Sequence, residues 1–216
     1  MNAGCQQQDP ENRKKAEYYN TLAQTVFFPI YPVIANQILE RTGIDQGHCL
    51  DIGSGPGHLA IALAALSDLK VCAMDNSREM YGIAQANIEK YRIEHRVRSI
   101  YGDVSEIPFP ESSVDLVVSR GSIFLWKNLT QGFSECRRVL RPGGAAYIGT
   151  GFGNVRLKNE VLLQMHERDP FWDTERKRRS RNCTPNKVRS ALAVAGISDY
   201  DIIQDDSGFW VMFRRQ

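Results

Sequence analysis

The 216-residue sequence lacks an apolar run that approaches the roughly 20 residues needed to cross a membrane. Residues 1–15, MNAGCQQQDPENRKK, also lack the apolar core of a secretory signal peptide. We therefore expect no membrane span and a cytoplasmic location.

Cysteine pairs at metal-binding spacing are missing as well. The five cysteines stand at positions 5, 49, 72, 136 and 183, an odd number with no Cys-x-x-Cys pair. That distribution argues against a disulfide framework and a compact zinc site, so we expect no metal. Cys49 and Cys72 fall within predicted strands and should be small buried side chains. Cys5 lies in a predicted disordered tail and Cys183 follows a basic run, so both should be accessible.

The sequence has little excess charge of either sign. Its formal net charge of +2 is too small to indicate a nucleic-acid partner or an anionic membrane, which favours a neutral or small substrate. The one local basic cluster runs from Glu175 to Arg181. Its first interpretation is a solvated helical face, and its second is contact of residues 176–181 with RNA or an acidic substrate.

From His48 onward, short apolar runs alternate with helical stretches, which is typical of β-α-β units in a parallel sheet. A short polar link that ends in Gly208 indicates a hairpin between the last two strands. We predict a Rossmann-like α/β fold, with helices on both faces of a seven-stranded, mostly parallel sheet whose last strand is antiparallel. The predicted strands are 49–52, 70–74, 97–101, 114–119, 145–150, 200–203 and 209–213, and the predicted helices are 11–26, a second ending at Gly43, 58–66, 77–91, 129–140, 155–168 and 185–195.

The chain is predicted to form one domain after a short tail. Residues 1–10 are expected to be disordered, and residues 11–216 to form the domain. Its parts are a helical cap at 11–46, a cofactor-binding core at 47–150, an insertion at 151–183, and a helix with a hairpin at 184–216. The insertion interrupts the alternation and either covers a ligand cleft or forms a solvated linker.

The most informative segment is LDIGSGPGHL at residues 50–59, where the first predicted core strand meets a helix. Glycines at 53, 55 and 57 let the main chain turn tightly and approach a ligand. A dinucleotide site would favour Gly-x-Gly-x-x-Gly, whereas this loop has Gly-x-Gly-x-Gly preceded by Asp51. A carboxylate there would repel a pyrophosphate but suit the ammonium group of an amino-acid moiety.

Two more acids stand where the next strands end. Asp75 is placed to accept both hydroxyls of a ribose, with capping of the helix opened by Asn76 as the alternative. Asp103 could accept from the exocyclic amine of an adenine, while Val104 and Met80 pack against the ring; Met80 could equally belong to the core. The acids therefore predict a nucleoside ligand.

Four segments resemble the class I S-adenosylmethionine-dependent methyltransferases, above all the branch that includes quinone-biosynthesis and other small-molecule enzymes. They are DIGSGPGHLA, AMDNSREM, GDVSEIPFPESSVDLVVS and RVLRPGGAAYIGT, in the family's order and spacing. Together they span roughly residues 47–150. The resemblance implies S-adenosyl-L-methionine as cofactor and S-adenosyl-L-homocysteine as product.

The resemblance also implies a role for individual residues. It assigns Asp51, Gly53, Ser54, Gly55 and Gly57 to the methionine end of the cofactor, Asp75 to the ribose, and Asp103 with Val104 to the adenine. The neighbouring residues Asn76, Met80, Gly102 and Arg120 complete the expected cofactor site.

Residues 119–126, SRGSIFLW, should border the transferred methyl group. Arg120 could hold a carboxylate of the cofactor or substrate, or pair with a structural acid. Trp126 could form a wall of the substrate pocket, or pack in the core. This loop lacks the Asn/Asp-Pro-Pro-aromatic sequence of members that methylate amino groups of adenine or glutamine. Candidates for substrate contact or proton movement are Tyr18, Tyr19, Tyr31 and His166, and the catalytic candidates are Arg120, Tyr19 and His166.

We therefore expect an S-adenosylmethionine-dependent methyltransferase that acts by direct displacement on a small-molecule acceptor. One alternative is an NAD-binding oxidoreductase, which the glycine spacing and the lack of a Tyr-x-x-x-Lys pair disfavour. The other is a non-catalytic module that binds S-adenosylmethionine or contacts RNA.

Overall fold

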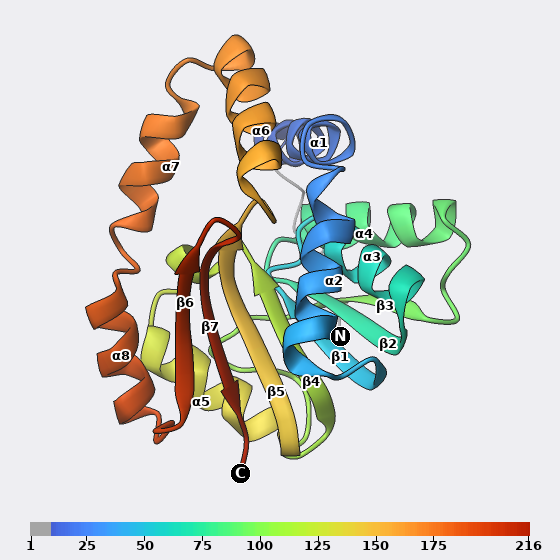
Figure 1. Ribbon diagram of the computed structural model, residues 1–216. Helices are drawn as coiled ribbons and strands as arrows, with labels where there is room; N and C mark the ends of the chain where they lie inside the picture. The colour runs from blue at the N-terminus through green and yellow to red at the C-terminus, as the bar shows by residue number, and fades with distance from the viewer. Residues whose placement is uncertain (1–9) are drawn as a thin grey trace.

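The structure, a computed structural model, describes residues 10–216 and is built on a seven-stranded sheet of order β3-β2-β1-β4-β5-β7-β6 (Figure 1). The predicted fold class is confirmed, and each predicted strand is present, with the predicted bounds for 97–101 and somewhat longer bounds for the others. The strands are β1 Gln46–Ile52, β2 Asp68–Asp75, β3 Val97–Tyr101, β4 Val114–Arg120, β5 Leu140–Gly151, β6 Tyr200–Asp205 and β7 Gly208–Arg214.

Strand β5 is the longest of these and begins earlier than predicted. Leu140 already pairs with Val114 of β4, and a register shift separates that pair from the regular ladder that starts at Leu116 and Ala145. Residues 140–144, which precede the predicted strand 145–150, are therefore included in the strand.

The strand directions follow the prediction. Strands β1 to β5 pair in parallel, and β7 is antiparallel to both β5 and β6. Strand β6 therefore runs in the same direction as the first five strands. Strands β5 and β7 approach each other closely at Gly149. A Cβ on this residue would collide with the backbone of Phe209 and would lie 2.8 Å from the Trp210 Cα.

Several helix boundaries follow from capping residues. Ser77, Asn128, Asn154 and Thr184 each accept a hydrogen bond from a main-chain amide in the first turn of the helix that they precede. Gly43 ends the second helix in the left-handed region, with φ of 64°. The helices are α1 Pro10–Thr25, α2 Ile30–Thr42, α3 His58–Leu66, α4 Arg78–Lys90, α5 Leu129–Val139, α6 Val155–Arg168, α7 Trp172–Ser180 and α8 Pro185–Val194, with a 3₁₀ turn η1 at Ile123–Leu125.

Alternate strand residues face opposite sides of the sheet and join two separate cores. On β1, Cys49 packs with the core formed by α2 and α3, whereas Leu50 packs with the core formed by α5 and α8. Cys49 and Cys72 are buried, as predicted. Helices thus cover both faces of the sheet.

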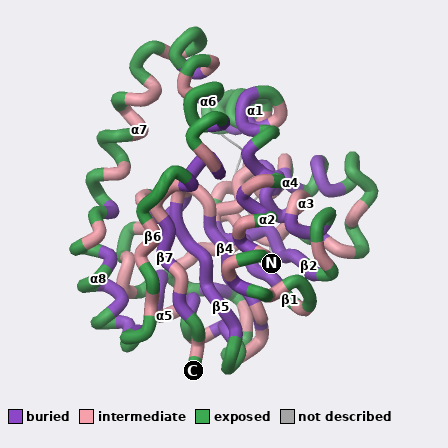
Figure 2. Tube along the Cα trace, in the orientation of Figure 1, coloured by how far each residue is buried: buried purple, intermediate pink, exposed green. Residues whose placement is uncertain are grey.

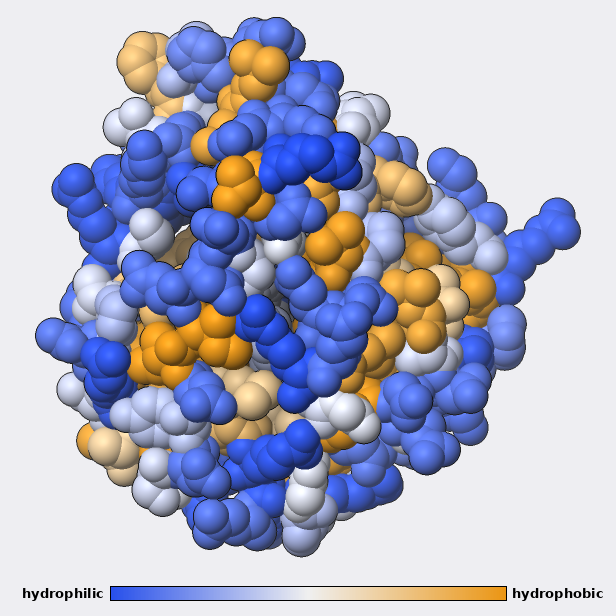
Figure 3. Space-filling view, in the orientation of Figure 1, coloured by the Kyte–Doolittle hydropathy of each residue, from blue (hydrophilic) through white to orange (hydrophobic). Residues whose placement is uncertain are grey.

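The segment 151–183 forms two helices that rise beside the end of the sheet where β5 finishes (Figure 1). Helix α7 has no buried residue, and Figure 2 shows it as exposed and intermediate along its length. Hydrophilic side chains cover most of it (Figure 3). The charged stretch predicted as a possible linker is therefore a helix attached to the rest of the molecule by few side chains.

Predictions for two polar segments of the chain differ from the structure or concern residues outside the described range. Cys183 is buried rather than accessible, because it packs with the α5 and α8 core, and burial raises its pKa to about 11. Pro10 opens α1 instead of belonging to the tail, and Cys5 with the rest of residues 1–9 lies outside the described residues.

Within residues 10–216, no single helix is long and apolar enough to span a membrane. Helices α1 and α2 pass that test only when taken together, as a pair bent by 76°.

Candidate functional site

A cavity of about 500 Å³ opens at the carboxyl ends of the central strands. It lies where the strand order reverses between β1 and β4, which is the usual ligand position in open α/β sheets. Its volume falls within the range of small-molecule sites. The lining comes from the loop after β1, the ends of β2, β3 and β4, the turn η1, and parts of α1, β5 and α7.

The loop after β1 presents main chain to the cavity. Gly53, Gly55 and Gly57 have φ of 64°, 53° and 82°, values that side-chain-bearing residues rarely adopt. A Cβ on Gly53 would collide with Ser122, and one on Gly55 would touch the Tyr19 ring at 3.6 Å. Gly53 and Gly55 line the cavity, so the backbone forms this wall.

Asp75 ends β2, and main-chain amides hold its carboxylate against the glycine loop. Gly55 N donates to Oδ2 at 2.8 Å, and Ser77 N donates to Oδ1 at 2.9 Å. Burial raises the pKa of Asp75, and these amide hydrogen bonds oppose that effect. The alternative role of Asp75 as a helix cap is only partly right. Asp75 does accept from Ser77 N, but the side chain that caps α4 is that of Ser77, which accepts from Met80 N.

Asp51 lies beneath the loop and is 1% exposed, so it does not line the cavity. Burial, followed by repulsion from Asp75, raises its pKa to about 7, while a hydrogen bond from the backbone of Ala60 opposes the shift. Its Oδ2 and the Ser54 Oγ are buried without a hydrogen-bond partner among the described residues. Orphaned acceptors beside a cavity are suited to a ligand that brings donors.

The end of β3 supplies a polar edge and an apolar surface. Asp103 Oδ1 accepts from the amide and the hydroxyl of Ser105, and its Oδ2 accepts from Asn76 Nδ2 at 2.9 Å. These hydrogen bonds lower the pKa of Asp103 and keep it ionised. Asn76, Met80, Gly102, Asp103 and Val104 all line the cavity. Met80 is therefore at the cavity wall and half-buried rather than in the core.

Arg120 ends β4 and has no acidic partner among the described residues. Its Nε and Nη2 both donate to the carbonyl of Gly151, at 3.2 and 3.1 Å. The structural-acid alternative for Arg120 is thus wrong. Trp126 serves both predicted purposes, because its ring lines the cavity and packs edge-on against Phe133.

Several predicted residues do not reach the cavity. Ser54 and Gly57 belong to the glycine loop without lining it, and Tyr31 is buried against Arg120 and His58. Tyr18 and His166 are exposed, on α1 and α6 respectively, and do not line the cavity. Of the predicted tyrosines, only Tyr19 lines it.

The sequence reasoning missed an aromatic and basic wall. Phe27, Phe152, Trp172, Arg176 and Arg179 line the cavity on the side away from the acids of β2 and β3. Three of them come from α7, which belongs to the insertion that we predicted either to cover a ligand cleft or to form a linker. An aromatic residue inside the charged stretch was the available signal for Trp172.

Ser122 was also missed, although it organises the wall between β1 and η1. Its hydroxyl donates to the carbonyl of Ile52, accepts from Trp126 Nε1 at 3.1 Å and lies 2.6 Å from the Ser119 hydroxyl. The indole of Trp126 is thereby fixed to the end of β1.

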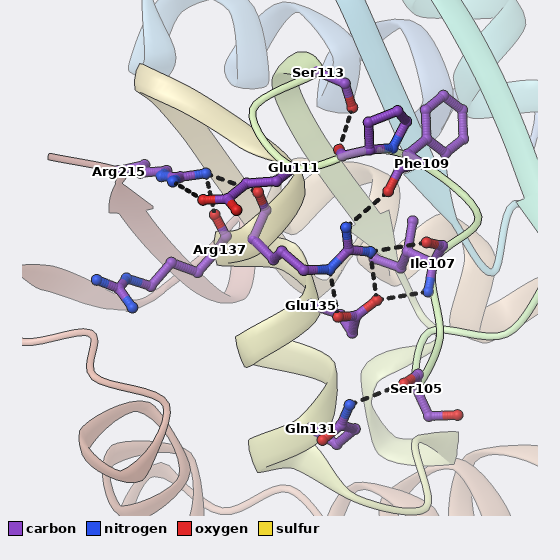
Figure 4. Close-up of polar contacts among 11 residues, drawn as sticks. Ser105, Ile107, Phe109, Glu111, Ser113, Gln131, Glu135, Arg137 and Arg215 are labelled. Carbon is purple, nitrogen blue, oxygen red and sulfur yellow. Dashed lines mark hydrogen bonds and ion pairs between the residues drawn. The ribbon is translucent and has the colours of Figure 1, made fainter.

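A second hollow lies beside α5 and the loop after β3 (Figure 4). Glu135 binds Arg138 and accepts from Ile107 N, while Arg138 donates to the carbonyls of Ile107 and Phe109. Gln131 donates to the Ser105 carbonyl. These groups satisfy one another's hydrogen-bonding capacity. Their contacts hold the loop after β3, which carries Asp103, against α5.

Comparison with known proteins identifies relatives of the whole domain. A family model described as a methyltransferase domain matches residues 50–148. The crystal structure of a candidate S-adenosyl-L-methionine-dependent methyltransferase from Methanococcus maripaludis is 38% identical, with 100% of this chain and 97% of that chain covered and a TM-score of 0.89.

Curated relatives match over shorter stretches. Demethylmenaquinone methyltransferase of Chlorobaculum tepidum is 35% identical over 99 residues, which are 46% of this chain and 38% of that protein. Malonyl-[acyl-carrier protein] O-methyltransferase of Geobacter sulfurreducens is 29% identical over 192 residues, 83% of this chain and 68% of that protein. The chain therefore spans well under half the length of the first of these two enzymes.

Proposed function

Because the chain belongs to the S-adenosylmethionine-dependent methyltransferase family, we propose that it transfers the cofactor's methyl group by direct displacement to a small-molecule acceptor. The observation that carries the proposal is the cavity beside the glycine loop, with Asp51, Asp75 and Asp103 at neighbouring strand ends. A Rossmann-like sheet alone would not carry it, since the same fold serves many functions.

The residues around the cavity fit the cofactor. We assign the ammonium group of its methionine part to the orphaned Oδ2 of Asp51, reached either directly or through water, its main-chain contacts to Gly53 and Gly55, and its ribose to Asp75. Asp103 would take the adenine edge, with Val104, Met80, Gly102 and Asn76 around the ring. To accept from the adenine amine, Asp103 Oδ2 must release or share its hydrogen bond with Asn76.

Methyl transfer depends more on aligning the acceptor with the methyl group than on transferring a proton. The cofactor supplies a methyl group that is already activated on a sulfonium. The protein aligns the acceptor and excludes water, and the aromatic rings of Phe27, Trp126 and Phe152 suit that purpose. Arg120 and Tyr19 line the cavity and are the remaining candidates for contact with the acceptor, whereas His166 does not line it.

We further propose that residues 151–183 act as a lid over the cavity. Helix α7 has no buried residue, yet Trp172 lies 6.0 Å from the ring of Phe27 and Arg176 lies 5.5 Å from that of Phe152. A helix held at its inner side by such contacts can open for acceptor entry and close for reaction. Hydrogen exchange of residues 172–180 should slow when S-adenosylhomocysteine binds, and unchanged exchange would contradict a lid.

A small acceptor is favoured over RNA by the pairing of charges on α7. Lys177 binds Asp173 and Arg178 binds Glu175, so much of the outer basic face is neutralised. The relatives described above are named for the methylation of demethylmenaquinone and of malonyl-[acyl-carrier protein]. The cytoplasmic location stays a prediction.

Calorimetry and a transfer assay test the proposal together. S-adenosylhomocysteine should bind to the purified protein and NAD⁺ should not. Asp75→Ala should weaken that binding at least tenfold, whereas Asp206→Asn, a change in the exposed β6–β7 turn, should leave it unaltered. Labelled S-adenosylmethionine with a small-metabolite extract should yield labelled product. Absence of S-adenosylhomocysteine binding would overturn the cofactor assignment, and binding without product would indicate a non-catalytic module.

A further inference from the structure

The cavity has a basic side and an acidic side. Its lining acids, Asp75 and Asp103, stand at the ends of β2 and β3. Arg120, Arg176 and Arg179 line it from the end of β4 and from α7, while another lining cation, Lys127, acts on Asp103 and lowers its pKa. Under the proposed function, the acidic side is taken by the cofactor's nucleoside. The basic side then faces the acceptor.

We propose that the acceptor carries an anionic group, a carboxylate or a phosphate, on a flat apolar body, and that Arg179 of α7 and Arg120 at the end of β4 bind the anion. This inference rests on the proposed function of the same site. It concerns the acceptor class, which neither the family nor the motifs define.

The first argument is the shortage of acids to balance these arginines. Arg120 makes its hydrogen bonds to the carbonyl of Gly151, and Arg179 forms no salt bridge among residues 10–216. Arg176 is paired with Asp173 at 2.6 Å. Arg120 and the exposed Arg179 therefore carry positive charge at the cavity that a ligand anion could neutralise.

The second argument is the aromatic surroundings of the guanidinium groups. The Arg120 guanidinium lies 5.5 Å from the Phe27 ring centre and 5.9 Å from that of Phe152. The Arg176 guanidinium lies 5.5 Å from Phe152 and 5.9 Å from Trp172. Stacked guanidinium groups keep their donors in a defined plane, which suits bidentate binding of carboxylate or phosphate. The same rings offer apolar surface for the body of the acceptor.

The third argument is the contrast along α7 itself. Lys177 and Arg178 point away from the cavity and pair with Asp173 and Glu175, while Arg179 lines the cavity. Arg181 follows the helix, is exposed and does not line the cavity. A surface for RNA would use the outer cations, whereas an anionic acceptor would use Arg179.

The test uses matched probes on the protein saturated with S-adenosylhomocysteine. The probes are a panel of aromatic carboxylates and aryl phosphates, such as 1-naphthoate and 1-naphthyl phosphate, each with its neutral amide or alcohol. Binding is followed by calorimetry. At least one anionic probe should bind tenfold or more tightly than its neutral partner, and comparison of the two anionic arms shows whether carboxylate or phosphate is preferred.

Variants locate the anion. Arg179→Gln should weaken the preferred anionic probe five- to tenfold and leave its neutral partner and S-adenosylhomocysteine unchanged. Arg181→Gln is the matched control and should bind every probe as the wild type does. Melting curves and circular dichroism check that both variants fold.

The outcomes separate this inference from the proposed function. If S-adenosylhomocysteine does not bind the wild type, the cofactor assignment fails. If S-adenosylhomocysteine binds but no anionic probe exceeds its neutral partner, the acceptor inference is overturned. Equal losses in Arg179→Gln and Arg181→Gln, or oligouridylate binding that both variants weaken equally, would assign the basic residues to an outer surface and would also overturn it.

Discussion

Asp51 should make the affinity for S-adenosylhomocysteine depend on pH near neutrality. In the ligand-free protein, burial and the charge of Asp75 raise the pKa of Asp51 to about 7. If its orphaned Oδ2 receives the ligand's ammonium group, the bound state requires the ionised carboxylate. Binding below pH 7 must then release a proton, and the affinity falls as the pH is lowered.

The size of the effect follows from the ionisation of Asp51. With a pKa of about 7, Asp51 is about one-eleventh ionised at pH 6 and about three-quarters ionised at pH 7.5. The ligand's ammonium group lies beside its own carboxylate and stays charged over this range. Binding should therefore be about eightfold weaker at pH 6 and about 75-fold weaker at pH 5 than at pH 7.5.

Stability of the ligand-free protein should change in the opposite direction. The folded protein keeps the Asp51 proton over a range where the unfolded chain has lost it, between the ordinary carboxyl pKa and about 7. The Asp51 contribution therefore favours the folded state less as the pH rises through this range, and the full cost is present above pH 7.

Calorimetry in buffers of different ionisation enthalpy measures both the affinity and the protons released. The control ligand is 5′-methylthioadenosine, which lacks the amino-acid part and should show no such dependence. In Asp51→Asn, the fall in S-adenosylhomocysteine affinity between pH 7.5 and pH 5 should vanish. A wild-type affinity that is flat from pH 5 to pH 7.5, or a methylthioadenosine affinity that falls in parallel, would refute the role of Asp51.

Three other predictions concern packing around the site. Gly149→Ala should lower the free energy of unfolding by about 1–3 kcal/mol, because the added Cβ would collide with β7. Gly82→Ala on α4 should raise it by about 0.5–1 kcal/mol, because a Cβ there meets nothing within 4 Å. Urea titration measures both changes, and equal stability of the two variants would contradict the close approach of β5 and β7. Ser122→Ala should cost about 1–3 kcal/mol by removing the acceptor of Trp126 Nε1, and unchanged unfolding together with unchanged Trp126 fluorescence would argue against that bond. Trp172→Ala should speed hydrogen exchange in α7 alone, because the ring anchors a helix with no buried residue; protection equal to the wild type would show that other contacts hold the helix.

The core of the fold could be predicted from local patterns. Alternating burial and capping residues such as Ser77 act over a few residues, so their signals are complete in the sequence. The hairpin before Gly208 and the direction of β7 followed in the same way. The glycine loop and the three acids stood at strand ends, and parallel strands bring those ends to one edge of the sheet.

The acceptor side could not be predicted in detail, because it depends on where a distant segment packs. Which of the α7 arginines enters the cavity is decided by the orientation of that helix against Phe27 and Phe152, residues far away in the chain. The error at Cys183 has the same origin: polar neighbours in sequence suggested exposure, but the residue packs with the α5 and α8 core.

The place of β7 in the sheet constrains how a growing chain can fold on the ribosome. Strand β6 is synthesised before β7, yet β7 is its only sheet partner among residues 10–216 and also lies along β5. Until β7 has left the exit tunnel, the nascent β6 has nothing to pair with and the long edge of β5 stays open to other chains. Trp210, fully buried on β7, joins the core only when that strand does.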